Sequence, residues 1–268
     1  MAIEATKTHS DSALRIERRG AGLWLTLNRP ADMNALNADI LDGIESGLAE
    51  ALQDDRIRAV VITGEGRAFC AGADLKGVLK ELAGGGLEAF LAEAGAVFGL
   101  VRNFPKPVIA GLNGLTLAGG LELALACDII IASDVVKIGD GHANFGVFPG
   151  AGGAALLPRR IGYHSAAFLL FTGDAIPAQT LMSWGLVQQI VPADQLTAAL
   201  GALVEKIAHK SPSALRRMKA VARVAPDMRE DAALELEKHE LREHMGGDDF
   251  REGLAAFSEK RKPVFSGR

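Results

Sequence analysis

The chain is poor in cysteine and has no cluster of metal-binding residues. Its 268 residues include two cysteines, Cys70 and Cys127, each with small or apolar neighbours in the sequence. Such surroundings are typical of buried free thiols, so we expect neither a disulfide nor a metal pair. The histidines and cysteines show no zinc-ligand spacing, and no metal site is predicted. A reducing, cytoplasmic setting is the expected localisation.

Excess positive charge and long apolar runs are also lacking. The net charge is -4 and the isoelectric point is about 5.9, which argues against a dedicated nucleic-acid binder. No apolar run reaches the roughly 20 residues of a membrane span. The amino terminus, MAIEATKTHSDSA, lacks the apolar segment of a secretory signal. We therefore expect no nucleic-acid partner and no membrane partner.

The pattern of apolar residues predicts an α/β fold in two parts. Short apolar runs alternate with helical patterns up to about residue 200, and the sequence beyond is helical and charged. We therefore place an α/β core at residues 1–200 and a helical region at 201–268. A glycine- and charge-rich segment at 76–92 is interpreted as a mobile loop or lid. Strands are predicted at 14–17, 23–27, 57–63, 107–112 and 128–132, and helices at 37–52, 87–103, 119–126, 162–172, 177–183, 193–209, 211–224, 228–244 and 248–260.

The stretch GLNGLTLAGGLELALACD, at residues 111–128, has the composition of a catalytic turn. After an apolar strand, Gly119 and Gly120 open a helix that carries Glu122 among apolar residues. Glycines at a helix start let a ligand approach backbone N–H groups that have no partner inside the helix. Because the helix dipole adds positive potential, such a turn can hold the negative oxygen of an activated carbonyl, with an acid or base one turn away. Taken alone, the stretch fits an ordinary helix start better than a catalytic one, because the helix dipole by itself favours a glutamate in a first turn.

A second glycine-rich stretch, IGDGHANFGVFPGAGG at residues 138–153, contains Asp140 and His142. Its GAGG run lacks the strand context and the downstream acid of a dinucleotide-binding turn, so that interpretation receives little weight. Ser133, Asp140 and His142 would form a hydrolytic triad on paper, but the serine has no nucleophile-elbow context. The simpler alternative for His142 is a loop histidine that only bonds backbone.

Five segments in order resemble the enoyl-CoA hydratase/isomerase (crotonase) superfamily and together cover almost the whole chain. They are LNRPADMNALN at 27–37, GRAFCAGADL at 66–75, PVIAGLNGLTLAGGLELALACD at 107–128, FPGAGG at 148–153 and EGLAAFSEKRKPVF at 252–265. The resemblance implies a spiral core of ββα turns and a C-terminal helical region that packs into homotrimers or dimers of trimers. It also implies an acyl-CoA thioester substrate, with no metal or redox cofactor.

The resemblance further implies roles for single residues. The backbone N–H groups of Ala73 and Gly119 correspond to an oxyanion hole that polarises the thioester carbonyl, where one donor typically contributes roughly 3 kcal/mol. The family usually has three glycines where this chain has Ala118-Gly119-Gly120, and we expect the small Ala118 to preserve the backbone path. Lys260 resembles a lysine that reaches a neighbouring subunit's ligand, although it and Lys76 could equally be surface charges. The positions that correspond to contacts with coenzyme A are Ala35, Ala71, Asp74, Lys76, Phe257 and Lys260.

The sequence departs from the family at the second acid/base position. Hydratases of this family hold one water between two carboxylates; Glu122 matches the first, and the second position falls on His142. Because an imidazole titrates near neutral pH, Glu122 and His142 could still divide water activation and proton delivery between them. Asp140 would then orient His142 or replace it.

We therefore predict reversible addition of water to a 2-enoyl-CoA. One alternative is an isomerase that uses Glu122 as a single base, and another is a CoA-thioester hydrolase or C–C lyase that uses His142. A more remote alternative is a non-catalytic acyl-CoA-binding or RNA-binding member. The wall of the acyl pocket is expected from residues 76–92 and 142–148.

Overall fold

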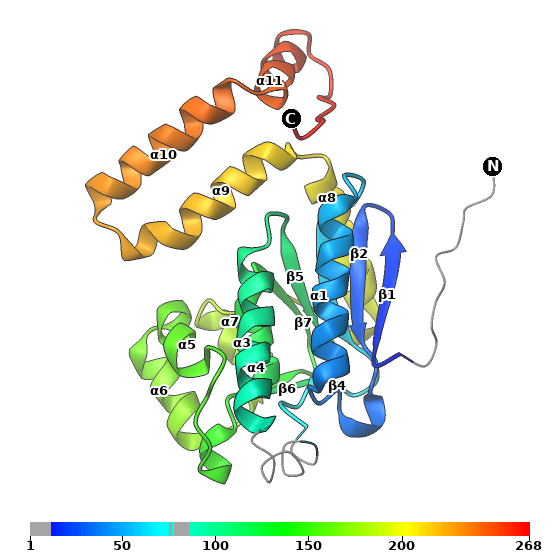
Figure 1. The fold of residues 1–268 in the computed structure, drawn as a ribbon, viewed down its shortest axis with the longest axis vertical. Coiled ribbons are helices and arrows are strands. Elements are labelled where there is room, and N and C mark those ends of the chain that lie inside the picture. The colour runs from blue at the N-terminus through cyan, green and yellow to red at the C-terminus, as the bar shows by residue number, and fades with distance from the viewer. Residues whose placement is uncertain (1–11, 75–76, 78–85) are drawn as a thin grey trace, which may run out of the picture.

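The computed structural model describes residues 12–74, 77 and 86–268. These residues form two β-sheets packed against helices, which confirms the predicted α/β class (Figure 1). In this part of the chain, no helix is long and apolar enough to cross a bilayer. Lys76 and much of the predicted 76–92 loop lie outside the described residues.

The larger sheet of the described chain has six strands in the order β1-β2-β3-β5-β7-β10. The first two form an antiparallel hairpin, and the other neighbours pair in parallel. The strands are β1 (Leu14–Arg19), β2 (Gly22–Leu27), β3 (Ala59–Gly64), β5 (Val108–Leu112), β7 (Ile129–Ser133) and β10 (Gln189–Val191).

A smaller sheet runs in the order β4-β6-β8-β9. Its strands are β4 (Ala68–Cys70), β6 (Leu115–Leu117), β8 (Lys137–Gly139) and β9 (Ile176–Pro177). Along the chain, β3, β5 and β7 enter the larger sheet, and each is followed by one strand of the smaller sheet. A helix then leads to the next pair, as α3 (Gly86–Asn103) and α4 (Gly119–Ala126) do. This repeated path is the predicted spiral of ββα turns.

The larger sheet is covered on both faces because its strand residues alternate between two apolar cores. In β3, Val60 and Ile62 face the core formed with α1 (Ala38–Gln53), α3 and α4. Val61 faces the opposite core, formed with α8 (Leu196–Ala208). Period-two alternation with both faces apolar is expected for a parallel sheet buried on both sides. The predicted buried free thiols, Cys70 and Cys127, lie in the first core.

The segment after β8 contains a helix that the sequence prediction missed. We expected a glycine-rich stretch up to residue 153 and the next helix only at 162–172. The structure has a short 3-10 helix, η2 (His142–Phe145), then α5 (Gly153–Ile161), α6 (Tyr163–Thr172) and α7 (Ala178–Ser183). The helix α5 was hidden because glycines precede its first turn and Pro158 lies inside it. Its start, Gly153, proves important for the candidate site.

The C-terminal helices extend away from the sheets (Figure 1). They are α9 (Pro212–Val224), α10 (Glu230–Met245) and α11 (Asp248–Ser258). The hydroxyl of Ser211 accepts from the backbone N–H of Ala214 and so caps the start of α9. The predicted division at residue 200 falls within α8, which packs on the larger sheet, so the extended part begins at α9.

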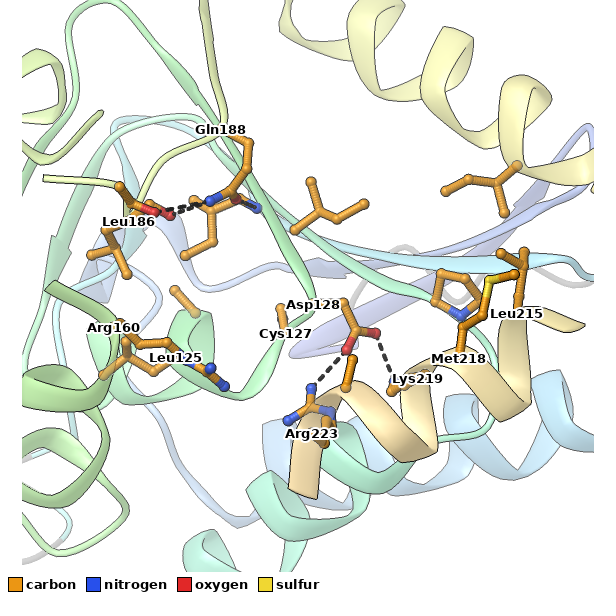
Figure 2. A pocket seen from close by; sticks show the side chains of 17 residues that line it. Leu125, Cys127, Asp128, Arg160, Leu186, Gln188, Leu215, Met218, Lys219 and Arg223 are labelled. Carbon is orange, nitrogen blue, oxygen red and sulfur yellow. Dashed lines mark hydrogen bonds and ion pairs between the residues drawn. The ribbon is translucent and has the colours of Figure 1, made fainter. Parts of the chain in front are cut away.

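Two ion pairs fasten α9 to the core, as Figure 2 shows. Asp128, at the start of β7, accepts from Lys219 Nζ at 2.6 Å and from Arg223 Nη2 at 2.7 Å. Beside this contact, between α9 and the end of α4, lies a cavity of about 500 Å³ with mainly apolar walls. The carboxylate of Asp249 on α11 accepts from the hydroxyls of Ser211 and Ser213, which joins α11 to the start of α9.

Candidate functional site

Glu122 is the central carboxylate of the site and is only 3% exposed. It lies one turn into α4, a helix whose residues are all buried. Its Oε1 atom accepts from the backbone N–H of Ala151 at 2.8 Å and of Gly153 at 2.9 Å. Both donors belong to the start of α5, where the helix dipole favours a negative charge. The backbone of α5 therefore holds one oxygen of Glu122, and sequence reasoning missed Ala151 and Gly153.

The turn before α4 is tightly constrained. A side chain at Gly120 would lie 2.2 Å from the carbonyl oxygen of Cys70, so only glycine fits there. Ala118 adopts φ 48° and ψ -118°, a conformation that favours glycine. Ala118 thus holds the turn in a strained backbone conformation. Strain of this kind typically costs about 1–3 kcal/mol.

The turn brings the predicted oxyanion donors, Ala73 and Gly119, together. Leu36 pairs with the segment around Ala73: its N–H donates to the carbonyl of Gly72 at 2.8 Å, and its carbonyl accepts from Asp74 at 2.9 Å. This pairing leaves the N–H of Ala73 free of the ladder. A Cβ placed on Gly119 would lie 3.7 Å from the Ala73 nitrogen. Among the described residues, neither N–H has a hydrogen-bond acceptor, so both are available to a carbonyl oxygen.

His142 is held by Asp140 at the start of η2. The ring Nδ1 lies 3.0 Å from Asp140 Oδ1, and the backbone N–H of His142 donates to the same oxygen at 3.3 Å. Burial alone would lower the pKa of His142. The hydrogen bond and charge of Asp140, with a smaller effect of the Glu122 charge, outweigh burial and raise this pKa above 6.5. The hydrogen bond to Asp140 therefore stabilises the imidazolium form of His142.

The carboxylates of Asp140 and Glu122 both lie close to Gly153. A Cβ placed on this glycine would lie 2.9 Å from Asp140 Oδ2 and 3.4 Å from Glu122 Oε1. Two carboxylates and one imidazole, from α4 and from the β8–η2 connection, thus meet at the start of α5. Ser133 does not join them, because its hydroxyl donates to the carbonyl of Asn113. Within the described residues, no group of three acidic, histidine or cysteine side chains forms a metal site.

The predicted contacts for coenzyme A divide into three groups. Ala35, Ala71 and Asp74 lie on the segments that frame the oxyanion donors, where Arg29 donates to the Ala35 carbonyl and to Asp74, each at 2.8 Å. Arg29 is a supporting residue that sequence reasoning missed. Lys76 lies outside the described residues.

Phe257 and Lys260 form the third group and stand apart from the site. Phe257 is 86% exposed on α11, and Lys260 follows that helix. Figure 1 shows α11 at the opposite end of the molecule from β4 and β6. Within one chain, the structure therefore does not bring these two residues to the other candidate contacts.

A cavity of about 310 Å³ lies beside the paired segments that contain Leu36 and Asp74. Leu36 and Asp74 line one side, and Phe90 and Glu93 of α3 line another. Gly77 and Gly86 also border it, and both belong to the segment 76–92 from which the acyl pocket wall is expected. The residues at 142–148 do not line this cavity. Asp74, which lines this cavity, follows Ala73 in the chain, so the cavity is a candidate for part of the thioester channel.

The sequence and the fold match a known family over most of the chain. The sequence model of the enoyl-CoA hydratase/isomerase family matches residues 18–268. The chain is 37% identical to the 2,3-dehydroadipyl-CoA hydratase of Escherichia coli K12, with 96% of this chain and 100% of that protein covered. It is 36% identical to the crotonyl-CoA hydratase of Syntrophomonas wolfei, with 90% and 93% covered.

Solved structures agree with the sequence relatives. The crystal structure of an enoyl-CoA hydratase from Bacillus anthracis matches with a TM-score of 0.90 at 34% identity, covering 95% of this chain and 99% of that one. The chain belongs to the enoyl-CoA hydratase/isomerase family.

Proposed function

We propose that the chain is an enoyl-CoA hydratase, which adds water reversibly to the double bond of a 2-enoyl-CoA thioester. The observation that carries the proposal is the convergence of Glu122 with the Asp140–His142 pair, one helical turn from two free backbone donors. The hydratase activities named for the two relatives support the same class of substrate. The proposed steps require no metal and no redox cofactor.

The backbone donors act on the carbonyl. In hydration, the thioester oxygen accepts from the N–H groups of Ala73 and Gly119, and negative charge moves onto it as the enolate forms. Since these donors are already in place, they stabilise that charge without reorganising, and one such donor is typically worth about 3 kcal/mol.

Glu122 and His142 divide the proton transfers. Glu122 takes a proton from water as the water oxygen bonds to C3, and the π electrons move towards the carbonyl oxygen. The enolate then collapses, and C2 takes a proton from the His142 imidazolium. Hydroxyl is thus added at C3 and hydrogen at C2, and the proton on Glu122 returns to His142 by way of solvent. This assignment follows from the raised pKa of His142, which favours the acid form of the imidazole and leaves the role of base to Glu122.

A second candidate function is hydrolysis of the thioester or cleavage of a C–C bond. The specific observation in its favour is the hydrogen bond between His142 and Asp140, since a histidine held by a carboxylate is also suited to activate water. An isomerase would need only Glu122 and would leave His142 without a chemical role. The hydratase proposal uses both residues, which is the reason for preferring it.

We further propose that the protein assembles as a homotrimer or a dimer of trimers and acts in the cytoplasm. Support for assembly comes from α10, where none of the residues is buried and several large apolar side chains are exposed. In such an assembly, the neighbouring chain would supply Phe257 and Lys260 to the coenzyme A site. Lys76 keeps its proposed role beside the same ligand.

The proposed function is tested with crotonyl-CoA and a longer 2-enoyl-CoA in ¹⁸O-labelled water, followed by mass spectrometry of the thioesters. We expect the wild type to add one labelled water. Glu122→Gln and His142→Ala should each slow this reaction by about 10²–10⁴-fold, the usual contribution of one acid or base.

Other outcomes would replace the proposal. Solvent hydrogen that enters the acyl chain without added oxygen would indicate isomerisation, and release of free coenzyme A would indicate hydrolysis. Full activity in His142→Ala would remove His142 from the mechanism. No change in any thioester would contradict hydratase activity on these substrates.

A further inference from the structure

We propose that Asp140 is a positioning residue that fixes His142 as the Nδ1–H tautomer and leaves Nε2 as its proton-exchanging nitrogen. This inference rests on the proposed function for the role of Nε2, whereas the tautomer itself can be measured without substrate. The position differs from the two-carboxylate pattern of the family because a histidine takes the place of the second carboxylate and is itself held by an aspartate, Asp140.

The first step in the argument is the chemistry of the hydrogen bond. Asp140 Oδ1 lies 3.0 Å from His142 Nδ1 and also accepts from the backbone N–H of His142. An ionised carboxylate can only accept, so Nδ1 must carry the hydrogen. The opposite tautomer would place a nitrogen lone pair against this oxygen.

The second step is the charge balance of Asp140. Its side chain is 1% exposed, and among the described residues Oδ2 has no hydrogen-bond partner. A buried carboxylate is costly unless it is paired. Its one side-chain partner in that part of the chain is His142. A residue that merely ended a surface turn would not need a desolvated carboxylate, so the environment of Asp140 is built to act on His142.

The third step is the rigidity of the support. Asp140 follows Gly139, whose carbonyl accepts from the N–H of Ala118 at 3.2 Å. A side chain at Gly139 would lie 2.2 Å from the carbonyl of Asp174, so the strand is closely packed there. This hydrogen bond fixes the position of Asp140 relative to the turn before α4, which carries Gly119. The imidazole is therefore held relative to the same turn that carries the backbone donors.

The fourth step distinguishes the role of Asp140 from the role of Glu122. The carboxylate of Glu122 is held by backbone N–H groups of Ala151 and Gly153, and not by His142. The charges that act on the imidazole are those of Asp140, from the β8–η2 connection, and of Glu122, from α4. Each carboxylate has its own partners, so Asp140 can orient the histidine while Glu122 stays available for chemistry.

The experiment is nitrogen NMR of the full-length protein labelled with ¹⁵N-histidine, in which the His142 signals are assigned by their loss in His142→Gln. In the wild type above the imidazole pKa, we expect the Nδ1–H tautomer. Asp140→Asn keeps an acceptor and removes the charge, so the tautomer should persist while the imidazolium pKa falls. Asp140→Ala removes the acceptor, so the Nε2–H tautomer, which isolated histidine prefers, should appear. Asp134→Asn, which changes an exposed aspartate in the turn between β7 and β8, is the matched control.

Kinetics on 2-enoyl-CoA provide the second readout. We expect kcat to fall in the order wild type, Asp140→Asn, Asp140→Ala, by about 10²-fold or more in the last, with KM little changed. An Nε2–H tautomer in the wild type, or an unchanged tautomer in Asp140→Ala, would overturn the inference about Asp140. The expected tautomers combined with full hydration by His142→Gln would overturn the role of Nε2 and the proposed mechanism, while the positioning by Asp140 would stand.

Discussion

At the scale of single residues, the sequence predicted some positions and could not predict their partners. Glu122 and the glycine pair stand out because an acid one turn into an apolar helix is unusual. The structure brings Ala73 and Gly119 together, and their role stays a prediction that the resemblance supplied. The hydrogen-bond partners of Glu122 and the burial of Asp140 depend on tertiary contacts between α5 and the end of β8. No local sequence pattern encodes such contacts.

The pH dependence of hydration follows from His142. If its imidazolium is the acid, activity is present below its raised pKa and is lost as the pH rises through that pKa. We expect kcat/KM for hydration of crotonyl-CoA to decline on the alkaline side with an apparent pKa above about 6.5. The same raised pKa stabilises the fold below the unfolded-state value near 6.5, and this contribution disappears as the pH rises through the folded-state pKa. His142→Gln should remove the alkaline decline, and a decline retained in that variant would assign it to another group.

At the scale of elements, the sequence predicted those whose signals are local. The helix α1 begins after Asn37, whose side-chain oxygen accepts from the Ile40 N–H at 3.1 Å, as a capping residue should. The helix α5 has no such cap, and its start at Gly153 is set by tertiary contacts with Glu122 and Asp140. Elements that are positioned by the site are the ones that a reading of the sequence misses.

The substitution Gly153→Ala tests whether the start of α5 supports the site. The added Cβ would meet Asp140 Oδ2 and Pro149 Cβ at 2.9 Å each, so the turn must shift. We expect a loss of about 1–3 kcal/mol in the free energy of unfolding, as for other overpacked positions. Because the Gly153 N–H holds Glu122, kcat for hydration should also fall, by at least about tenfold.

The matched control is Gly201→Ala in α8, where an added Cβ meets no atom within 4 Å. It should raise stability by up to about 1 kcal/mol, because alanine favours helix over glycine, and should leave kcat unchanged. Urea unfolding and steady-state kinetics measure both effects. Wild-type kcat in Gly153→Ala would mean that α5 does not position Glu122.

At the scale of the whole molecule, the sequence predicted the α/β core and a charged helical C-terminal region. It did not predict the contacts that attach this region to the core. Asp128 binds Lys219 and Arg223, and each of these side chains is mostly buried. Such partners lie 91 and 95 residues away in the chain, beyond the reach of local patterns. The arrangement holds α9 to the core and leaves α10 extended beside it (Figure 1).

The exposed face of α10 predicts the assembly. Leu234, Leu241 and Met245 are about half exposed and are spaced by seven and four residues, so they share one helical face. If this face is an interface between chains, Leu241→Glu buries an unpaired charge there and should dissociate the assembly. Light scattering should give three or six times the 28.2 kDa chain mass for the wild type and a single chain for the variant. His239→Glu, on the opposite face of the exposed helix, should keep the assembly.

The assembly also bears on substrate binding, because α11, which carries Phe257 and precedes Lys260, lies at the opposite end of the molecule from β4 and β6 (Figure 1). If a neighbouring chain supplies these two residues, the dissociated Leu241→Glu variant should show a raised KM for acyl-CoA. Lys260→Ala should raise KM in the same direction without changing the mass, since Lys260 is an exposed charge beyond α11. A monomeric wild type would contradict the proposed trimer. An assembled wild type with unchanged KM in Lys260→Ala would instead show that this lysine does not serve the ligand.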